Sequence, residues 1–131
     1  MYGKQELAMK MWKPWLLLFV CLTLLLSGCL REVSFKRDLQ PVLQRNCLPC
    51  HKAGGEGYVA SGFSMETYDN LMHGTKFGPM IIPGESINSS FIRLMDHKTD
   101  SAIHMPRNSS KLSARDIEMF EKWVDAGAPN N

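Results

Sequence analysis

The residues best suited to chemistry are the consecutive Cys47-Leu48-Pro49-Cys50-His51. On a helical turn, two cysteines at this spacing lie close enough to bind one flat group together. A thiol can bond to each of the two vinyl groups of a porphyrin, and the imidazole that follows can ligate the porphyrin iron. The spacing C-x-x-C-H is the attachment signature of a c-type haem. We therefore predict one covalent haem c, bonded to Cys47 and Cys50, with His51 as an axial ligand of the iron.

Other uses of a cysteine pair fit this sequence less well. A structural zinc site needs a second pair of ligands, and no cysteine follows Cys50. A thiol-disulfide oxidoreductase would carry the pair near a strand-helix-strand unit, whereas helix-forming and loop-forming residues surround it here. That alternative would show a titratable dithiol and no haem absorbance.

The second axial position on the iron largely decides whether a haem transfers electrons or binds a small ligand. Met105 is the candidate we favour, because it lies in a polar loop outside any apolar periodicity. Pro106 follows it and restricts its backbone to extended conformations. His104, Met80 or an open position are the alternatives. The remaining candidates have plainer roles, with His73 and His97 expected at solvated helix ends and Met72, Met95 and Met119 as core filler.

The first 28 residues are typical of a secretion signal. Three lysines precede an apolar run over residues 15–26, and small residues follow it. The run is shorter than the roughly 20 residues that cross a bilayer, so a cleaved signal is favoured over an uncleaved anchor. Leu26-Ser27-Gly28-Cys29 resembles the bacterial lipobox, which implies a lipid on Cys29. By resemblance to bacterial sorting rules, Leu30 rather than aspartate after the cysteine implies the outer membrane over the inner one.

This interpretation gives each of the four cysteines a role without a disulfide: Cys21 lies inside the signal, Cys29 bears lipid, and Cys47 and Cys50 bind haem. A structural disulfide would have to use Cys29 and would leave an odd thiol. Residues 1–28 hold three of the 15 basic residues and one of the 13 acidic ones, so the remainder is formally neutral. Nucleic acid calls for a strongly basic face, and we expect no such partner.

Residues 29–33 are predicted to be a tether, residues 34–128 a single domain, and residues 129–131 a tail. An amphipathic helix is expected over residues 35–50, running into the cysteine motif. Its apolar stripe consists of Leu39, Val42, Leu43, Cys47 and Cys50. Pro41 would interrupt a helix interior, so Asp38 is expected as the N-cap, while a start at Ser34 would require a kink.

The rest of the domain is predicted to be loops and short helices, without strands or repeats. Residues 52–62 are rich in glycine and are expected to form a loop at an edge of the cofactor. Short helices are predicted over residues 66–72 and after Asn88. The last helix is expected to begin at the N-cap Ser113 and to end at Gly127.

The order of these parts resembles the class I cytochrome c fold over residues 34–128. More narrowly, it is similar to the small cytochrome domains of planctomycete-type and related bacterial proteins. The segments that carry the resemblance are 41–43, 47–51, 82–85, 90–93, 104–106 and 123–128. Arg107 stands where that family has a second proline after the methionine. The resemblance implies an all-α fold of three to five helices around one haem, with crossing terminal helices and Met105 as the axial ligand.

From the motif and the resemblance together we expect a lipid-anchored electron-transfer protein and not an enzyme, although it can be a subunit of a larger oxidoreductase. It would face the periplasm of a bacterial cell envelope. Its partners would be a reductase and an oxidase or dehydrogenase, met in weak, transient encounters. A haem sensor or small peroxidase-like enzyme with an open sixth position is the alternative, and carbon monoxide or cyanide binding would reveal it.

Overall fold

The computed structural model describes residues 31–107 and 110–131, and Glu32–Asn131 forms one compact unit. The predicted signal peptide and Cys29 lie outside the described residues. The elements are η1 (Phe35–Leu39), α2 (Gln40–Asn46), α3 (Glu56–Ser61), α4 (Tyr68–His73), η2 (Ser86–Asn88), α5 (Ser90–Met95), η3 (Ser101–Ile103) and α6 (Ala114–Asp125). Across these two ranges the only β pairing is an isolated bridge between Thr75 and Gly78. The all-α prediction is confirmed for this part of the chain.

The first helix begins earlier than the proline suggested. Its first turn, η1, is π-helical and starts after Ser34, whose hydroxyl accepts a hydrogen bond from the Arg37 backbone. Asp38 is not the N-cap; its carboxylate accepts a hydrogen bond from the Ser34 N–H at 2.9 Å. A helix that starts after Ser34 needed an irregularity before the proline, and the wider π-turn provides it. Pro41 consequently lies in the first turn of α2, where its missing N–H removes no hydrogen bond of that helix. The α-helix ends at Asn46, so the expectation of a helix through Cys50 was wrong.

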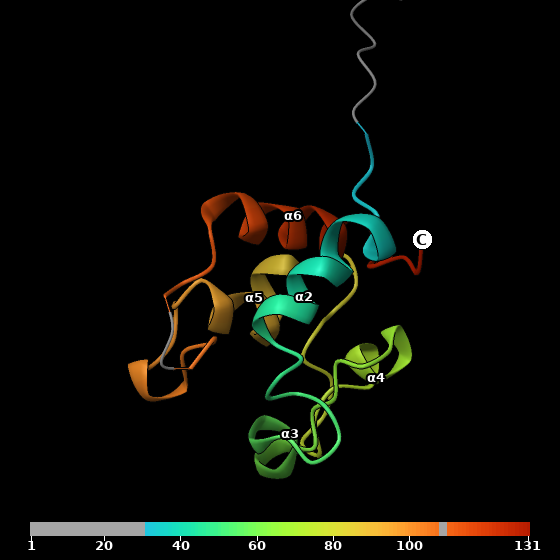
Figure 1. Cartoon of the computed structure of the whole chain (residues 1–131). Coiled ribbons are helices and arrows are strands. Elements are labelled where there is room, and N and C mark those ends of the chain that lie inside the picture. The colour runs from blue at the N-terminus through green and yellow to red at the C-terminus, as the bar shows by residue number, and fades with distance from the viewer. Residues whose placement is uncertain (1–30, 108–109) are drawn as a thin grey trace, which may run out of the picture. The chain divides into compact units, whose positions relative to one another are not determined.

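The N-terminal and C-terminal helices pack on each other, as the resemblance implied (Figure 1). The ring centroids of Phe35 and Trp123 are 5.6 Å apart. Leu39, Phe120 and Trp123 are fully buried in the same hydrophobic cluster. Burying these large apolar side chains is the main source of stability in a domain of this size.

The last helix has the boundaries that its local sequence predicted. The Ser113 hydroxyl accepts a hydrogen bond from the Asp116 backbone N–H at 3.1 Å, which satisfies one of the free donors at the start of α6. Leu112 precedes this cap and Ile117 follows it, and both are buried, as in a hydrophobic staple. Gly127, with φ of 93°, follows the last turn.

The glycine-rich segment after the motif differs from its prediction. Residues 52–62 contain the helix α3, which follows Gly55 and has no buried residue. Sequence periodicity missed it because a helix that buries no apolar face has no apolar stripe. Figure 1 shows α3 at the end of the domain opposite α6. The helix predicted over residues 66–72 is confirmed as α4, which ends before Gly74.

The last residue, Asn131, is hydrogen-bonded to the start of the domain. The carbonyl of Asn131 accepts hydrogen bonds from the Ser34 hydroxyl at 2.9 Å and the Lys36 N–H at 3.0 Å, and its side-chain oxygen accepts one from the Phe35 N–H at 2.7 Å. The segment predicted as a tail is therefore bonded to the start of the domain. Within the described ranges, no helix is long and apolar enough to cross a membrane.

Candidate functional site

The cysteine motif follows directly on the end of α2. The Cys47 N–H donates to the Leu43 carbonyl, and the His51 N–H donates to the Cys47 carbonyl, each at 2.9 Å. The motif is thus one further turn of chain after the α-helix. Cys47 is half-buried against the hydrophobic core, whereas Cys50 is exposed, and both thiols are free. Two unpaired thiols held on one turn can both bond to a single flat ligand beside them.

The environment of Cys47 is unlike that of a redox-active thiol. Burial, together with the charge that a nearby Cys50 thiolate would carry, raises the pKa of Cys47 to about 12. Catalytic C-x-x-C thiols have lowered pKa values and often lie at the positive N-terminal end of a helix. Here the pair lies at the negative, C-terminal end of α2, which disfavours a thiolate further. The structure therefore weighs against thiol-disulfide exchange.

His51 is buried, with 8% of its surface exposed. Its Nδ1 lies 3.0 Å from the Phe63 carbonyl oxygen. Because a carbonyl can only accept a hydrogen bond, Nδ1 carries the hydrogen, and Nε2 is left with a lone pair. Histidines that ligate metals commonly donate their other ring N–H to a backbone carbonyl, which fixes the tautomer and the ring plane.

Gly57 of α3 lies directly against the His51 ring. A Cβ built on Gly57 would be 2.6 Å from Cε1 and 2.8 Å from Nε2 of His51, distances that real contacts do not show. No side chain can occupy this position while His51 stays where it is. The backbone of α3 at Gly57 therefore packs directly on the imidazole ring.

Met105 differs from the other methionines of the described segments. Met95 is buried in the hydrophobic core, and Met65, Met72, Met80 and Met119 pack against it. The core-filler role predicted for Met72, Met95 and Met119 is confirmed. Met105 is half-buried outside this cluster, in the loop after η3, and its N–H donates to the Leu94 carbonyl at 3.2 Å. Its thioether is consequently not committed to core packing.

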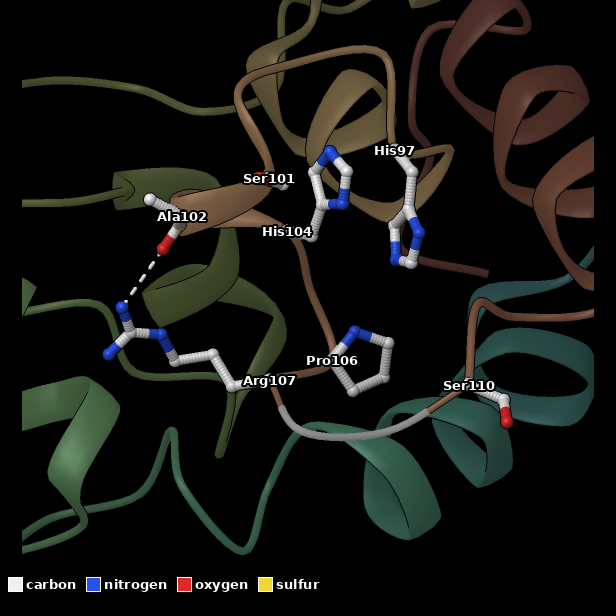
Figure 2. Close-up of a pocket in the computed structure, with 7 residues that line it drawn as sticks. All are labelled: His97, Ser101, Ala102, His104, Pro106, Arg107 and Ser110. Atoms are coloured by element: carbon white, nitrogen blue, oxygen red, sulfur yellow. Dashed lines mark hydrogen bonds between the residues drawn. The ribbon is translucent and has the colours of Figure 1, made fainter.

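Two histidines stack beside Met105. The rings of His97 and His104 are 4.2 Å apart and nearly parallel, at 11° (Figure 2). Nε2 of His104 lies 3.0 Å from the Thr99 carbonyl, and Nε2 of His97 lies 3.3 Å from the Met105 carbonyl. His97 was expected at a solvated helix end; it does follow α5, but it is half-buried and has partners. His73, at the end of α4, is exposed as predicted.

A cavity of about 860 Å³ adjoins this loop. Its lining includes His97, His104, Pro106 and Arg107, so it borders Met105 on both sides in sequence (Figure 2). A volume of this size is within the range of cofactor sites. Neither Met105 itself nor Cys47, Cys50 or His51 lines it, so this cavity does not join the cysteine motif to Met105.

The residues present fit a haem rather than a metal bound by protein alone. Among the described residues, no group of three or more His, Cys, Asp or Glu side chains is placed to hold an ion. A haem iron takes four ligands from the porphyrin and needs only one or two from the chain. Here the chain supplies free thiols and an imidazole already oriented by a backbone carbonyl.

Sequence reasoning missed two residues of this site. Phe63 contributes a carbonyl, which every residue has, so its side chain gave no signal. Gly57 was noted only as part of a glycine-rich stretch, and its contact with His51 requires the fold. A glycine that is needed because another group lies against it can be recognised only once the three-dimensional structure is known.

Comparison with known proteins found one family model that matches part of the chain. Residues 47–108, which include the cysteine motif and Met105, match the family model described as Planctomycete cytochrome C. No curated protein and no solved structure matches the chain. The match supports a cytochrome c-type domain over these residues.

Proposed function

We propose that this protein carries single electrons on one haem c, in a domain of class I cytochrome c fold. Cys47 and Cys50 hold the porphyrin by thioether bonds, and His51 and Met105 are the axial ligands of the iron. The observation that carries the proposal is the hydrogen bond from His51 Nδ1 to the Phe63 carbonyl, which leaves Nε2 to bind iron beside two free thiols. The haem supplies a reversible one-electron change at iron.

The chain's own residues keep the iron in one coordination state. His51 is buried and fixed through Phe63, so its ring does not have to reorient when the oxidation state changes. A methionine opposite the histidine favours the reduced state and raises the reduction potential. We place Met105 rather than His104 in that position because the Met105 thioether is not committed to core packing, whereas the His104 ring is stacked on His97.

Optical spectra of the natively matured protein test the ligand assignment. We expect a low-spin, six-coordinate spectrum that carbon monoxide changes only slowly at neutral pH. Replacing Met105 with leucine should produce a five-coordinate ferrous haem that binds carbon monoxide promptly, with a lower reduction potential. A Met80→Leu variant is the matched control, because Met80 packs against the core. An unchanged spectrum and potential in Met105→Leu would exclude Met105 as the ligand.

A second function has one observation in its favour. The cavity beside Met105 is polar and includes His104 and Arg107, side chains of the types used to cleave peroxide. The Arg107 guanidinium, however, donates to the Ala102 carbonyl at 2.9 Å. If carbon monoxide or cyanide binds the wild-type protein promptly, the sixth position is open, and a sensor or peroxidase-like role replaces electron transfer.

We further propose that Cys29 bears the lipid that anchors the domain to the cell envelope, facing the periplasm, with the outer membrane favoured. The lipobox-like segment 26–29 supports this proposal. Several acyl chains on one terminus give stable attachment, whereas one chain binds only marginally. In cells, Cys29→Ala should move the protein from the membrane fraction to the soluble fraction without loss of haem absorbance. Its redox partners would meet the anchored domain in weak, transient complexes.

A further inference from the structure

We propose that His97 is a positioning residue that holds the Met105 loop in place for iron ligation. This inference rests on the proposed function, because it assigns a role toward the ligand Met105. His97 itself is not a ligand in this proposal. It acts through a hydrogen bond to the Met105 backbone and through its stacking on His104.

The first support is the set of bonds that fix the Met105 backbone. Its N–H donates to the Leu94 carbonyl at 3.2 Å, which attaches it to α5. Its carbonyl lies 3.3 Å from Nε2 of His97, and because a carbonyl only accepts, His97 is the donor. Both backbone polar groups of Met105 are thus bound by residues at the end of one helix. A ligand held in this way is preorganised for the metal.

The second support is the backbone of His97 itself. Its φ is +55°, a left-handed conformation that glycine and asparagine adopt more readily than histidine. A histidine in this position adds unfavourable backbone energy, which its side chain has to offset. The imidazole stacks on His104 at 4.2 Å while its Nε2 reaches the Met105 carbonyl, so one ring supports two consecutive residues of the loop (Figure 2). An unfavourable backbone conformation maintained by such contacts suggests a functional role.

Two substitutions separate the hydrogen bond from the backbone conformation. His97→Asn tolerates the left-handed backbone, but its amide nitrogen lies one bond closer to the main chain than Nε2 does. His97→Gln carries its amide nitrogen the same number of bonds away as Nε2 and should partly restore the bond. His73→Asn is the matched control, because His73 is an exposed histidine at the end of a different short helix.

The readouts are taken on the matured, haem-containing protein. We expect His97→Asn to weaken the long-wavelength absorption band of the sulfur-iron bond in the ferric state and to lower the reduction potential. Carbon monoxide should bind the ferrous state about 5–10-fold faster, the population shift that loss of one neutral hydrogen bond produces. His97→Gln should fall between His97→Asn and wild type, and His73→Asn should match wild type. Thermal unfolding checks that each variant is folded.

Met105→Leu distinguishes failure of this inference from failure of the proposed function. If Met105→Leu abolishes the sulfur-iron band and His97→Asn leaves band, potential and carbon monoxide rate unchanged, His97 does not position the loop. If neither substitution has an effect, the ligand assignment itself is wrong, and the inference falls with it. Should His97→Asn not fold, ¹⁵N NMR of wild-type reduced protein decides: an Nε2-protonated His97 with slow hydrogen exchange supports the proposal, and an Nδ1-protonated ring overturns it.

Discussion

Replacing Gly57 with alanine sets two effects of opposite sign against each other. Within a helix, alanine is more favourable than glycine by up to about 1 kcal/mol, so helix propensity alone predicts a more stable protein. The contact with His51 predicts the reverse. The new Cβ would lie 2.6 Å from Cε1 and 2.8 Å from Nε2, where ordinary contacts begin at 3.4 Å.

To relieve this overlap the His51 ring has to move by about 1 Å, comparable to overpacking a core at about 1–3 kcal/mol. The movement also stretches the 3.0 Å bond from Nδ1 to the Phe63 carbonyl, which contributes about 1 kcal/mol more. After the gain in propensity is subtracted, we expect a net loss of about 1–3 kcal/mol in the free energy of unfolding. The displaced imidazole should also weaken the low-spin haem spectrum.

Denaturant unfolding monitored by circular dichroism measures the stability, and optical spectra of the same samples measure the ligation. Ala60→Gly is the matched control, because Ala60 is an exposed residue of the same helix and reports the propensity term alone, a loss of about 1 kcal/mol. If Gly57→Ala stabilises the protein by as much as Ala60→Gly destabilises it, the imidazole does not rest on Gly57, and the site geometry described above is incorrect.

Three further predictions concern the core, the C-terminal closure and the thiols. Phe120→Ala should lower the free energy of unfolding by about 3–5 kcal/mol, since the ring is fully buried in the core and packs on Phe91; an unshifted melting curve would disprove that packing. Asn131→Ala should lower it by about 0.5–2 kcal/mol through loss of the Phe35 bond, whereas the exposed neighbour Asn130→Ala should leave it unchanged, and equal effects would rule out the closure. In haem-free protein, iodoacetamide at pH 8–9 should modify Cys50 well before Cys47. Burial raises the pKa of Cys47 to about 12, and the reactive thiolate fraction of Cys47 grows only as the pH approaches that value. Equal modification rates at pH 8 would contradict this environment.

The sequence was sufficient wherever a local signal and the tertiary contacts agreed. Ser113 begins α6 as predicted, because a hydroxyl cap and a buried staple act over a few neighbouring residues. Leu39 and Leu43 are buried as their helical spacing required. The all-α part of the fold prediction also followed, since the apolar positions recur at helical and not at strand spacing.

Other features depended on interactions that short-range patterns do not encode. The start at Ser34 needs a π-turn and a reciprocal bond with Asp38, and the proline concealed it. The helix α3 lacks an apolar stripe because it buries no side chain. The stacking of His97 on His104 joins residues across a loop whose path no periodicity specifies.

Covalent haem attachment at the cysteine motif is the central claim, and intact-mass analysis of the natively matured protein tests it most directly. We expect a mass increased by that of one haem, which stays bound after denaturation, together with no thiol available at Cys47 or Cys50. A polypeptide without added tetrapyrrole, in which both of these thiols can be alkylated, would contradict it.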